Sequence, residues 1–210
     1  MLLILTGDIQ TGKTRWLEGI VAELGAHGVR TEGVLAPGIW RKLEGIPMDA
    51  PAHKQFEKLG IDNILLPEAK RIRFALRRDL AEGSAILDSG SQSSRAQLGW
   101  EILENAIAEV NDHFERLLTE RMAHRSPCLL VIDELGRLEL ERDGGLTGAV
   151  ALLEDGPHGR SHHALIVVRS SLADIAERRF AGIWGDSQRI APDDKARKLV
   201  LGLMGAAKEG

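Results

Sequence analysis

The chain has 210 residues, a length that suits one compact domain with an insertion better than two complete domains. Its 43% of apolar residues allow a full core, while the formal net charge of −4 argues against a protein that mainly coats nucleic acid, because phosphate backbones are bound by Lys and Arg. The single cysteine, Cys128, excludes an intrachain disulfide and is typical of a reducing compartment.

The sequence has none of the usual patterns of export or membrane insertion. Only five apolar residues precede Thr6, too few for a signal peptide, and no apolar run approaches the ~20 residues of a membrane span. We therefore expect a soluble, cytoplasmic protein with no membrane partner. Aromatic residues make up 4% of the chain and Tyr is absent, so nucleic acid is not an expected partner either.

Predicted strands and helices alternate along most of the chain. Residues 2–6 predict a buried strand and 7–12 a loop, and apolar residues at helical spacing predict a helix from Lys13 to about Leu24. This alternation predicts an α/β fold with a mostly parallel sheet flanked by helices. Further strands are predicted over 31–35, 128–132, 163–168 and near 183–190, and further helices over 100–122, 144–153, 172–180 and 193–204.

Residues 36–94 have a different texture. Gly and Pro interrupt short apolar pieces such as Asn63–Leu66 and Ile72–Leu76, which is typical of short strands joined in hairpins. The segment Ser89–Arg95 contains few apolar residues, so we interpret it as a loop. We thus expect a single domain over 1–210 that carries a β-rich insertion over 36–94.

The first motif with chemical content lies between the first strand and the first helix. The run Gly7-Asp8-Ile9-Gln10-Thr11-Gly12-Lys13-Thr14 matches G-x-x-x-x-G-K-[ST] in full. Such a loop directs backbone N–H groups and a helix N-terminus at phosphates, while Lys13 reaches the β/γ-phosphates and Thr14 offers a hydroxyl to Mg²⁺. The alternative is a glycine turn with a solvated lysine, but the strand–loop–helix context predicts a P-loop NTPase fold. The predicted nucleotide-binding residues are Gly7, Asp8, Ile9, Gln10, Thr11, Gly12, Lys13, Thr14 and Arg15, with the Asp8 carboxylate expected to point outward.

A second motif joins an apolar strand to two carboxylates. Residues Leu129–Ile132 are followed directly by Asp133 and Glu134. In phosphate-loop enzymes a strand of the same sheet delivers an Asp to the Mg²⁺ shell, so Asp133 is the predicted second metal ligand beside Thr14. Glu134 leaves the strand in another direction and is the predicted base that orients and deprotonates a water in line with the γ-phosphate, which favours hydrolysis. By itself the pattern also fits a solvated turn at a strand end.

The residues that follow carry a resemblance. The stretch Val131–Leu140, with the sequence VIDELGRLEL, resembles the D-E-[IL]-G-x-[ML]-E-L signature of the nucleoside-triphosphatase family described from hyperthermophiles, also known as the cancer-related nucleoside-triphosphatase family. The order of parts agrees over about residues 1–180. The resemblance implies a phosphate-loop α/β fold and slow, Mg²⁺-dependent hydrolysis of nucleoside triphosphates with little base preference.

The same resemblance assigns expected roles to single residues. Phosphate and metal would be bound by Gly12, Lys13 and Thr14, Mg²⁺ by Asp133, and the attacking water would be activated by Glu134. Gly136 and Glu139 carry over as members of the motif, and a role in loop geometry is expected for them. The chain departs from the family in having Gln10 where a glycine is frequent, Arg15 where a second Thr is frequent, and Arg169 where many members have His.

An arginine that reaches the γ-phosphate raises hydrolysis greatly in related chemistry. Arg169 directly follows an apolar strand, at the end of the sheet where ligands bind, and is the predicted catalytic arginine beside Lys13 and Glu134. Arg137 and Arg95 are the alternatives. For each of these arginines a surface ion pair is the competing interpretation.

Other residue groups are interpreted as structural. The basic run predicts a solvated strand and turn, with a surface for RNA or an acidic partner as the alternative. The histidines near Asp155 predict a polar loop rather than a metal site, the tryptophans either stack a base or belong to the core, and Cys128 is expected in a buried strand. These groups are Lys70, Arg71, Arg73, Arg77 and Arg78; His158, His162 and His163; and Trp16, Trp40 and Trp184.

The motifs together predict Mg²⁺-dependent hydrolysis of ATP or GTP to diphosphate and phosphate. Two alternatives stay open. One is a phosphotransferase whose small-molecule acceptor site is supplied by residues 36–94, and the other is a nucleotide-controlled binding module with negligible turnover. The N-K-x-D motif that usually reads the base in GTP switches does not occur in the sequence.

Overall fold

The computed structural model describes residues 1–8, 11–47, 50–81, 100–120, 128–157 and 163–205. The strands are β1 (Leu2–Leu5), β2 (Arg30–Leu35), β3 (Gly38–Lys42), β4 (Phe56–Leu66), β5 (Lys70–Arg77), β6 (Trp100–Ile102), β7 (Cys128–Leu135), β8 (His163–Val168) and β9 (Ser187–Ile190). The helices are α1 (Lys13–Ala26), α2 (Ala52–Gln55), α3 (Arg78–Ala81), α5 (Glu104–Glu120), α6 (Arg137–Glu141), α7 (Thr147–Asp155), the 3₁₀ turn η1 (Ser170–Leu172), α8 (Ala173–Phe180) and α9 (Asp194–Leu203).

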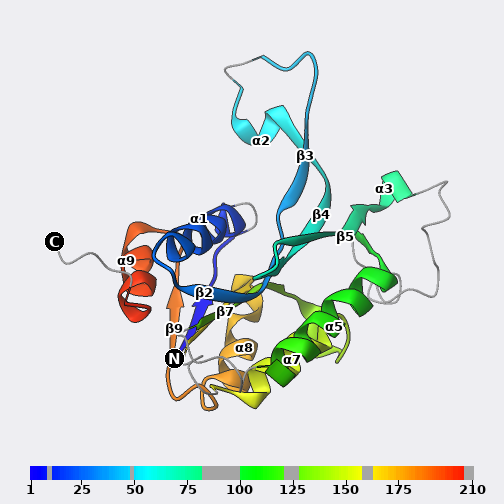
Figure 1. Cartoon of the computed structure of the whole chain (residues 1–210). Coiled ribbons are helices and arrows are strands. Elements are labelled where there is room, and N and C mark those ends of the chain that lie inside the picture. The colour runs from blue at the N-terminus through cyan, green and yellow to red at the C-terminus, as the bar shows by residue number, and fades with distance from the viewer. Residues whose placement is uncertain (9–10, 48–49, 82–99, 121–127, 158–162, 206–210) are drawn as a thin grey trace.

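One sheet runs through the molecule in the order β6-β5-β4-β2-β7-β8-β1-β9, and β3 pairs with β4 (Figure 1). The strands β2, β7, β8, β1 and β9 are adjacent and parallel to one another. Leu3 in β1, for example, pairs with Leu165 in β8 and with Gln188 in β9. All four residues of β1 are buried, as expected for a strand covered on both faces. The predicted α/β fold with its parallel sheet is confirmed.

The strands formed by the Gly- and Pro-interrupted segment are antiparallel. β4 pairs with β2, β3 and β5, and β5 pairs with β6. The predicted pieces Asn63–Leu66 and Ile72–Leu76 are parts of β4 and β5. The outer part of the β3–β4 hairpin and α2 form an arm that projects from the body (Figure 1). The Ser89–Arg95 segment lies outside the described residues.

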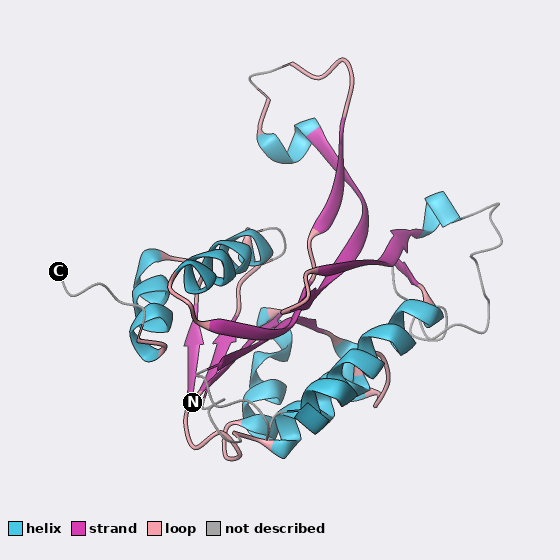
Figure 2. Ribbon diagram, in the orientation of Figure 1, coloured by secondary structure: helices cyan, strands magenta, loops and turns pink. Residues whose placement is uncertain are grey.

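Helices cover both faces of the sheet (Figure 2). α1 and α9 pack on one face, where Leu17 and Val200 meet the side chains of β1, β7 and β8. α5, α7 and α8 pack on the other face around Val110, Phe114 and Phe180. None of the helices in the described part of the chain combines the length and apolar character needed to cross a membrane.

Two of the predicted boundaries are wrong. The helix predicted from Trp100 begins only at Glu104, because Trp100–Ile102 pairs as β6 with β5 and gains ladder hydrogen bonds there. The Leu103 N–H continues this contact by donating to the Phe74 carbonyl at 2.9 Å. The strand predicted to end at residue 132 runs to Leu135, which is buried and opposite Val168 of β8. The acidic pair therefore lies inside β7, and the short helix α6 follows it.

Candidate functional site

The phosphate loop joins β1 to α1 at the carboxyl edge of the parallel strands. Gly12 caps α1 with a φ of 83°, a left-handed conformation that favours glycine. The buried Lys13 ammonium donates to the carbonyl oxygens of Gly7 at 2.9 Å and Asp8 at 2.7 Å. The Thr11 hydroxyl also donates to the Asp8 carbonyl, at 2.9 Å. The loop thus closes around the one cation that the motif predicts for binding phosphate.

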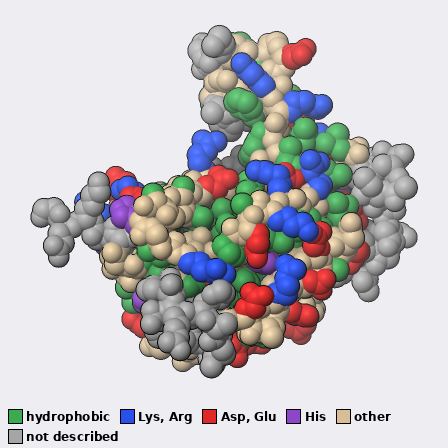
Figure 3. All heavy atoms as spheres, viewed as in Figure 1, with side chains coloured by type: hydrophobic (Ala, Val, Ile, Leu, Met, Phe, Trp, Pro, Cys, Tyr) green, Lys and Arg blue, Asp and Glu red, His purple; other side chains and the backbone are tan. Residues whose placement is uncertain are grey.

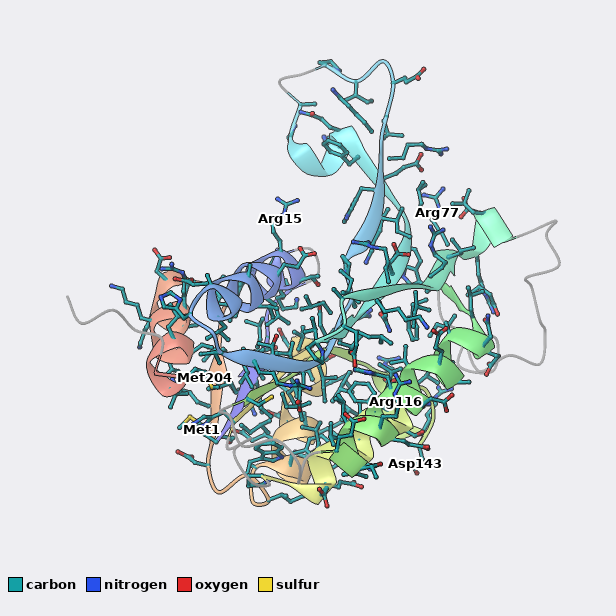
Figure 4. The ribbon with its side chains drawn as sticks, viewed as in Figure 1. Met1, Arg15, Arg77, Arg116, Asp143 and Met204 are labelled. Atoms are coloured by element: carbon teal, nitrogen blue, oxygen red, sulfur yellow. The ribbon has the colours of Figure 1, made fainter. Side chains whose placement is uncertain are left out.

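The remaining loop residues fall into two groups. The Asp8 side chain is exposed, which agrees with its expected outward direction. Arg15 is exposed on α1 and points away from the sheet, on the side from which the arm projects (Figure 4). Ile9 and Gln10 lie outside the described residues.

Asp133 is connected to the start of α1 and to the end of β2. Its Oδ1 accepts a hydrogen bond from the Thr14 hydroxyl at 3.3 Å, and its Oδ2 accepts one from the Ala36 N–H at 3.1 Å. The side chain is 2% exposed. Burial raises the pKa of Asp133 to about 6, although the bonds from Ala36 and Thr14 act in the opposite direction.

The donor set around Asp133 fits magnesium. One carboxylate and one hydroxyl are hard oxygen ligands, and Mg²⁺ is usually held by one or two such protein groups together with substrate phosphates and water. Within the described residues no group of three or more His, Cys, Asp and Glu is arranged to hold a metal. Thr14 and Asp133 are the residues that would hold Mg²⁺ together with phosphate oxygens.

Glu134 and Arg169 meet across two neighbouring strands. Arg169 Nε donates to Glu134 Oε1 at 3.0 Å, and both side chains remain partly exposed. They are adjacent because the carboxyl ends of β7 and β8 lie side by side. The predicted base and the predicted arginine are thus in contact with each other, about one residue beyond the buried Asp133 along the strand.

Glu139 stabilises the turn that follows the acidic pair through hydrogen bonds. Its carboxylate accepts hydrogen bonds from the N–H groups of Gly136 at 2.8 Å and Leu146 at 3.0 Å. Burial raises the pKa of Glu139, and these two bonds lower it. Gly145 approaches so closely that an added Cβ would lie 1.9 Å from Glu139 Oε1. The loop role expected for Gly136 and Glu139 agrees with these contacts.

A cavity of about 460 Å³ opens beside these groups. On one side it is lined by Thr14, Asp133, Glu134 and Arg169, and on the other by residues of β4, β5 and β6. Arg137 also lines it, and its guanidinium lies 3.9 Å from Glu141. The residues contributed by the antiparallel strands are Lys58, Ile61, Asn63, Phe74, Ala75, Trp100 and Ile102.

Two polar residues of this wall had no signal in the sequence. The Lys58 ammonium lies 5.3 Å from the centre of the Trp100 ring. Burial lowers the pKa of Lys58, while the charges of Glu134 and Asp133 raise it, so the ammonium is within electrostatic reach of the acidic pair. Asn63 is 1% exposed. Neither residue belongs to a motif, and the pairing of β4 brings both to the cavity.

The basic run has acidic partners throughout. Asp62 binds both Arg71 and Arg73, and Arg77 bridges Glu57 and Asp79. Lys70 pairs with Glu109, and Arg78 lies 3.5 Å from Glu101. Figure 3 shows Lys and Arg side chains interspersed with Asp and Glu on this side of the molecule. This charge balance favours a solvated face over a surface for RNA.

The remaining tryptophans, histidines and cysteine that the sequence analysis considered do not gather at one site. Trp184 is buried and donates to the Leu153 carbonyl at 2.9 Å, so it belongs to the core. Trp16 donates to the Asp193 carbonyl at 3.2 Å, and Trp40 is 45% exposed on the arm. Cys128 is buried in β7 as expected. His163 begins β8, whereas Arg95, His158 and His162 lie outside the described residues.

The fold and the arrangement of these two motifs define the fold class of the protein. A loop between β1 and α1 faces an acidic pair in a parallel strand, and β8 separates the two strands, as in a P-loop NTPase fold. No family model matches the sequence, and no curated protein matches it.

Two solved structures are similar to this chain over almost their whole length. THEP1 from the hyperthermophile Aquifex aeolicus is 19% identical, with a TM-score of 0.57 over 97% of this chain and 96% of that one. A human cancer-related nucleoside triphosphatase is 15% identical, with a TM-score of 0.57 over 98% of each chain. The fold implied by the VIDELGRLEL resemblance is thus confirmed, and the likeness extends beyond residue 180.

Proposed function

We propose that the chain hydrolyses nucleoside triphosphates, ATP or GTP, to diphosphate and phosphate in the presence of Mg²⁺. The observation that carries this proposal is the hydrogen bond between Thr14 Oγ1 and Asp133 Oδ1. These residues are 119 positions apart in the sequence, yet their oxygens form one small set of hard ligands at the N-terminus of α1. The solved structures with this fold include one named as a nucleoside triphosphatase, which supports the same activity.

The phosphate loop would bind the triphosphate. Its backbone N–H groups and the N-terminus of α1 favour negative charge at this point. The Lys13 ammonium would exchange the carbonyls of Gly7 and Asp8 for β- and γ-phosphate oxygens. Thr14 and Asp133 would hold Mg²⁺, which supplies charge neutralisation at the β- and γ-phosphates when bound.

Glu134 and Arg169 would act at the γ-phosphate. The Glu134 carboxylate accepts the proton of the attacking water, because it lies beside the proposed metal ligand and faces the cavity. The Arg169 guanidinium orients that carboxylate and adds positive charge where negative charge develops on the transferred phosphoryl group. Removing one member of this pair therefore leaves the other without its partner.

Phosphate release from ATP and GTP with Mg²⁺ tests the proposal. Glu134→Gln is expected to lower the rate by roughly 10²–10⁴-fold, because the amide cannot accept the proton of the water, while nucleotide still binds because the phosphate loop is unchanged. Glu115→Gln, an exposed position on α5, is the matched control and should retain the wild-type rate. Equal rates for wild type and Glu134→Gln would reject Glu134 as the base, and tight nucleotide binding without turnover in wild type would favour a nucleotide-controlled binding module.

A further inference from the structure

The cavity extends from the metal side of the phosphate site into the antiparallel part of the sheet. Among the phosphate-loop residues that the structure describes, only Thr14 lines the cavity. Asp133 and Glu134 line it as well. A triphosphate with its γ-phosphate at Thr14 and Asp133 would therefore face this space with its reactive end. The cavity is larger than one attacking water requires, and its volume is within the range of small-molecule sites.

Asn63 is the most unusual residue of the cavity wall. It is 1% exposed, and neither Nδ2 nor Oδ1 has a hydrogen-bond partner among the described residues. Leaving a buried donor or acceptor unpaired costs about 1–3 kcal/mol, so an unpaired carboxamide is retained at the expense of stability. Its backbone is fixed by the β4–β5 ladder opposite Ile72.

The chemistry of a carboxamide defines its partner. The donor Nδ2 and the acceptor Oδ1 belong to the same planar group. Together they match an acceptor and a donor that lie next to each other on one edge of a ligand. Nucleobases present such edges, and Asn reads adenine in this way in nucleic acids. Because the carboxamide is covered, contact with a ligand requires a small movement of the cavity wall.

The other walls suit a flat ring. Phe74 and Trp100 offer aromatic surfaces, and Ile61 and Ile102 add apolar area. The Lys58 ammonium lies over the Trp100 ring, 5.3 Å from its centre, and Glu134 lines the same cavity. The cavity thus combines a hydrogen-bonding edge, stacking surfaces and a cation next to the phosphate site.

We propose that this cavity binds a nucleoside-class molecule, which is recognised by Asn63 and accepts the γ-phosphoryl group on a hydroxyl. In this step the hydroxyl oxygen bonds to the γ-phosphorus, and the bond from that phosphorus to the β–γ bridging oxygen breaks. The nucleoside diphosphate leaves with the electron pair, and the hydroxyl proton passes to the Glu134 carboxylate. The transfer step rests on the proposed function, because it uses the same phosphate site, whereas binding of the nucleoside does not.

Calorimetric titration of adenosine, guanosine, cytidine, uridine and thymidine, without triphosphate, tests the site directly. We expect at least one nucleoside to bind wild type, and Asn63→Leu to weaken it by about tenfold or more, since it removes both hydrogen bonds. Asn105→Leu, at an exposed position of α5, is the matched control. Thermal unfolding of Asn63→Leu should match or exceed wild type, because two unpaired polar atoms are removed, so weaker binding cannot be attributed to misfolding.

A second comparison separates this cavity from the triphosphate site. Lys13→Ala should lose triphosphate binding and keep nucleoside binding. Loss of nucleoside binding in Lys13→Ala, or no binding of any nucleoside to wild type, overturns the proposed site. Detection of a nucleoside monophosphate by ³¹P NMR, with ATP, Mg²⁺ and the bound nucleoside, supports transfer, and release of inorganic phosphate alone overturns it. If nucleosides bind but ATP is not turned over, the proposed function and the transfer step are rejected. The proposed nucleoside-binding site is supported by the same result.

Discussion

Asp133 combines near-complete burial with two hydrogen bonds, from Thr14 and Ala36. Its carboxylate must be ionised to serve as a metal ligand, yet burial raises its pKa to about 6. Protons would therefore compete with the proposed Mg²⁺ ion for this carboxylate in mildly acidic solution. The residue that the sequence assigns to the metal is also one whose charge changes close to neutral pH.

We expect Mg²⁺ to enhance nucleotide binding about tenfold less at pH 5 than at pH 7.5, because a group with a pKa near 6 is mostly protonated at the lower pH. Titration of Mg²⁺ at constant nucleotide concentration measures the effect. Asp133→Asn removes the titrating group, so the part of the pH dependence that exceeds the titration of the nucleotide itself should disappear. A wild-type profile identical to that of the variant would contradict the assignment.

His113 is a buried titratable residue that does not line the cavity. It lies on α5 with Nε2 3.1 Å from the Gly33 carbonyl oxygen, and burial lowers its pKa below the ordinary value of 6.5. The unfolded chain therefore takes up a proton at this residue before the folded chain does. Stability is retained above pH 6.5 and falls as the pH decreases through that value toward the lower folded pKa.

Urea unfolding at pH 7.5 and pH 5.5 measures the contribution of His113. The unfolding free energy should be lower at pH 5.5, and for this one group the loss cannot exceed ~1.4 kcal/mol per pH unit. His113→Gln should reduce the dependence on pH, and the exposed His27→Gln is the control. If His113→Gln loses stability with pH as steeply as wild type, the effect belongs to other groups.

At the scale of elements, the contact between β2 and β7 brings Ala36 and Asp133 together. Gly33 in β2 has a φ of 116°, and an added Cβ there would lie 2.0 Å from the Val131 carbonyl oxygen. Only glycine allows the two strands to approach in this way. The position of the buried carboxylate relative to β2 thus depends on a residue without a functional group.

Gly33→Ala is expected to destabilise the fold by about 3 kcal/mol or more, because it adds both backbone strain and overlap with a neighbouring strand. Denaturant unfolding monitored by circular dichroism measures the change. Gly19→Ala, on the exposed face of α1 with no described atom within 4 Å of the new methyl group, should instead raise stability by ~0.5–1 kcal/mol. A small effect of Gly33→Ala would indicate that β2 and β7 can separate at low cost.

Local patterns predict one part of the site, and long-range pairing determines the rest. The phosphate loop and the acidic pair lie within a few residues of strand ends, so the motifs were enough to predict that Thr14 and Asp133 lie at the same edge of the sheet. Lys58 and Asn63 reach the cavity through the antiparallel register of β4 and a bulge against β5, which no local pattern specifies. The apolar residues of Trp100–Ile102 continue the spacing of α5 and so predict a helix, whereas pairing with β5 decides the conformation of this segment.

At the scale of the whole molecule, ligand binding should stabilise the fold. Mg²⁺ with a slowly hydrolysed triphosphate at ~100 times its dissociation constant is expected to raise the free energy of unfolding by about 2.7 kcal/mol. Thermal unfolding with and without EDTA measures the part that depends on metal. Lys13→Ala should show no stabilisation by the same mixture, and an equal increase for this variant would mean that the nucleotide binds elsewhere.

The parallel and antiparallel halves of the sheet meet where β2 pairs with β4. Their shared register consists of three residue pairs, from Gly33–Leu66 to Leu35–Ile64. Because this contact between the two halves is short, we expect substitutions in the hairpins beyond it to leave the arrangement of the phosphate loop and Asp133 unchanged.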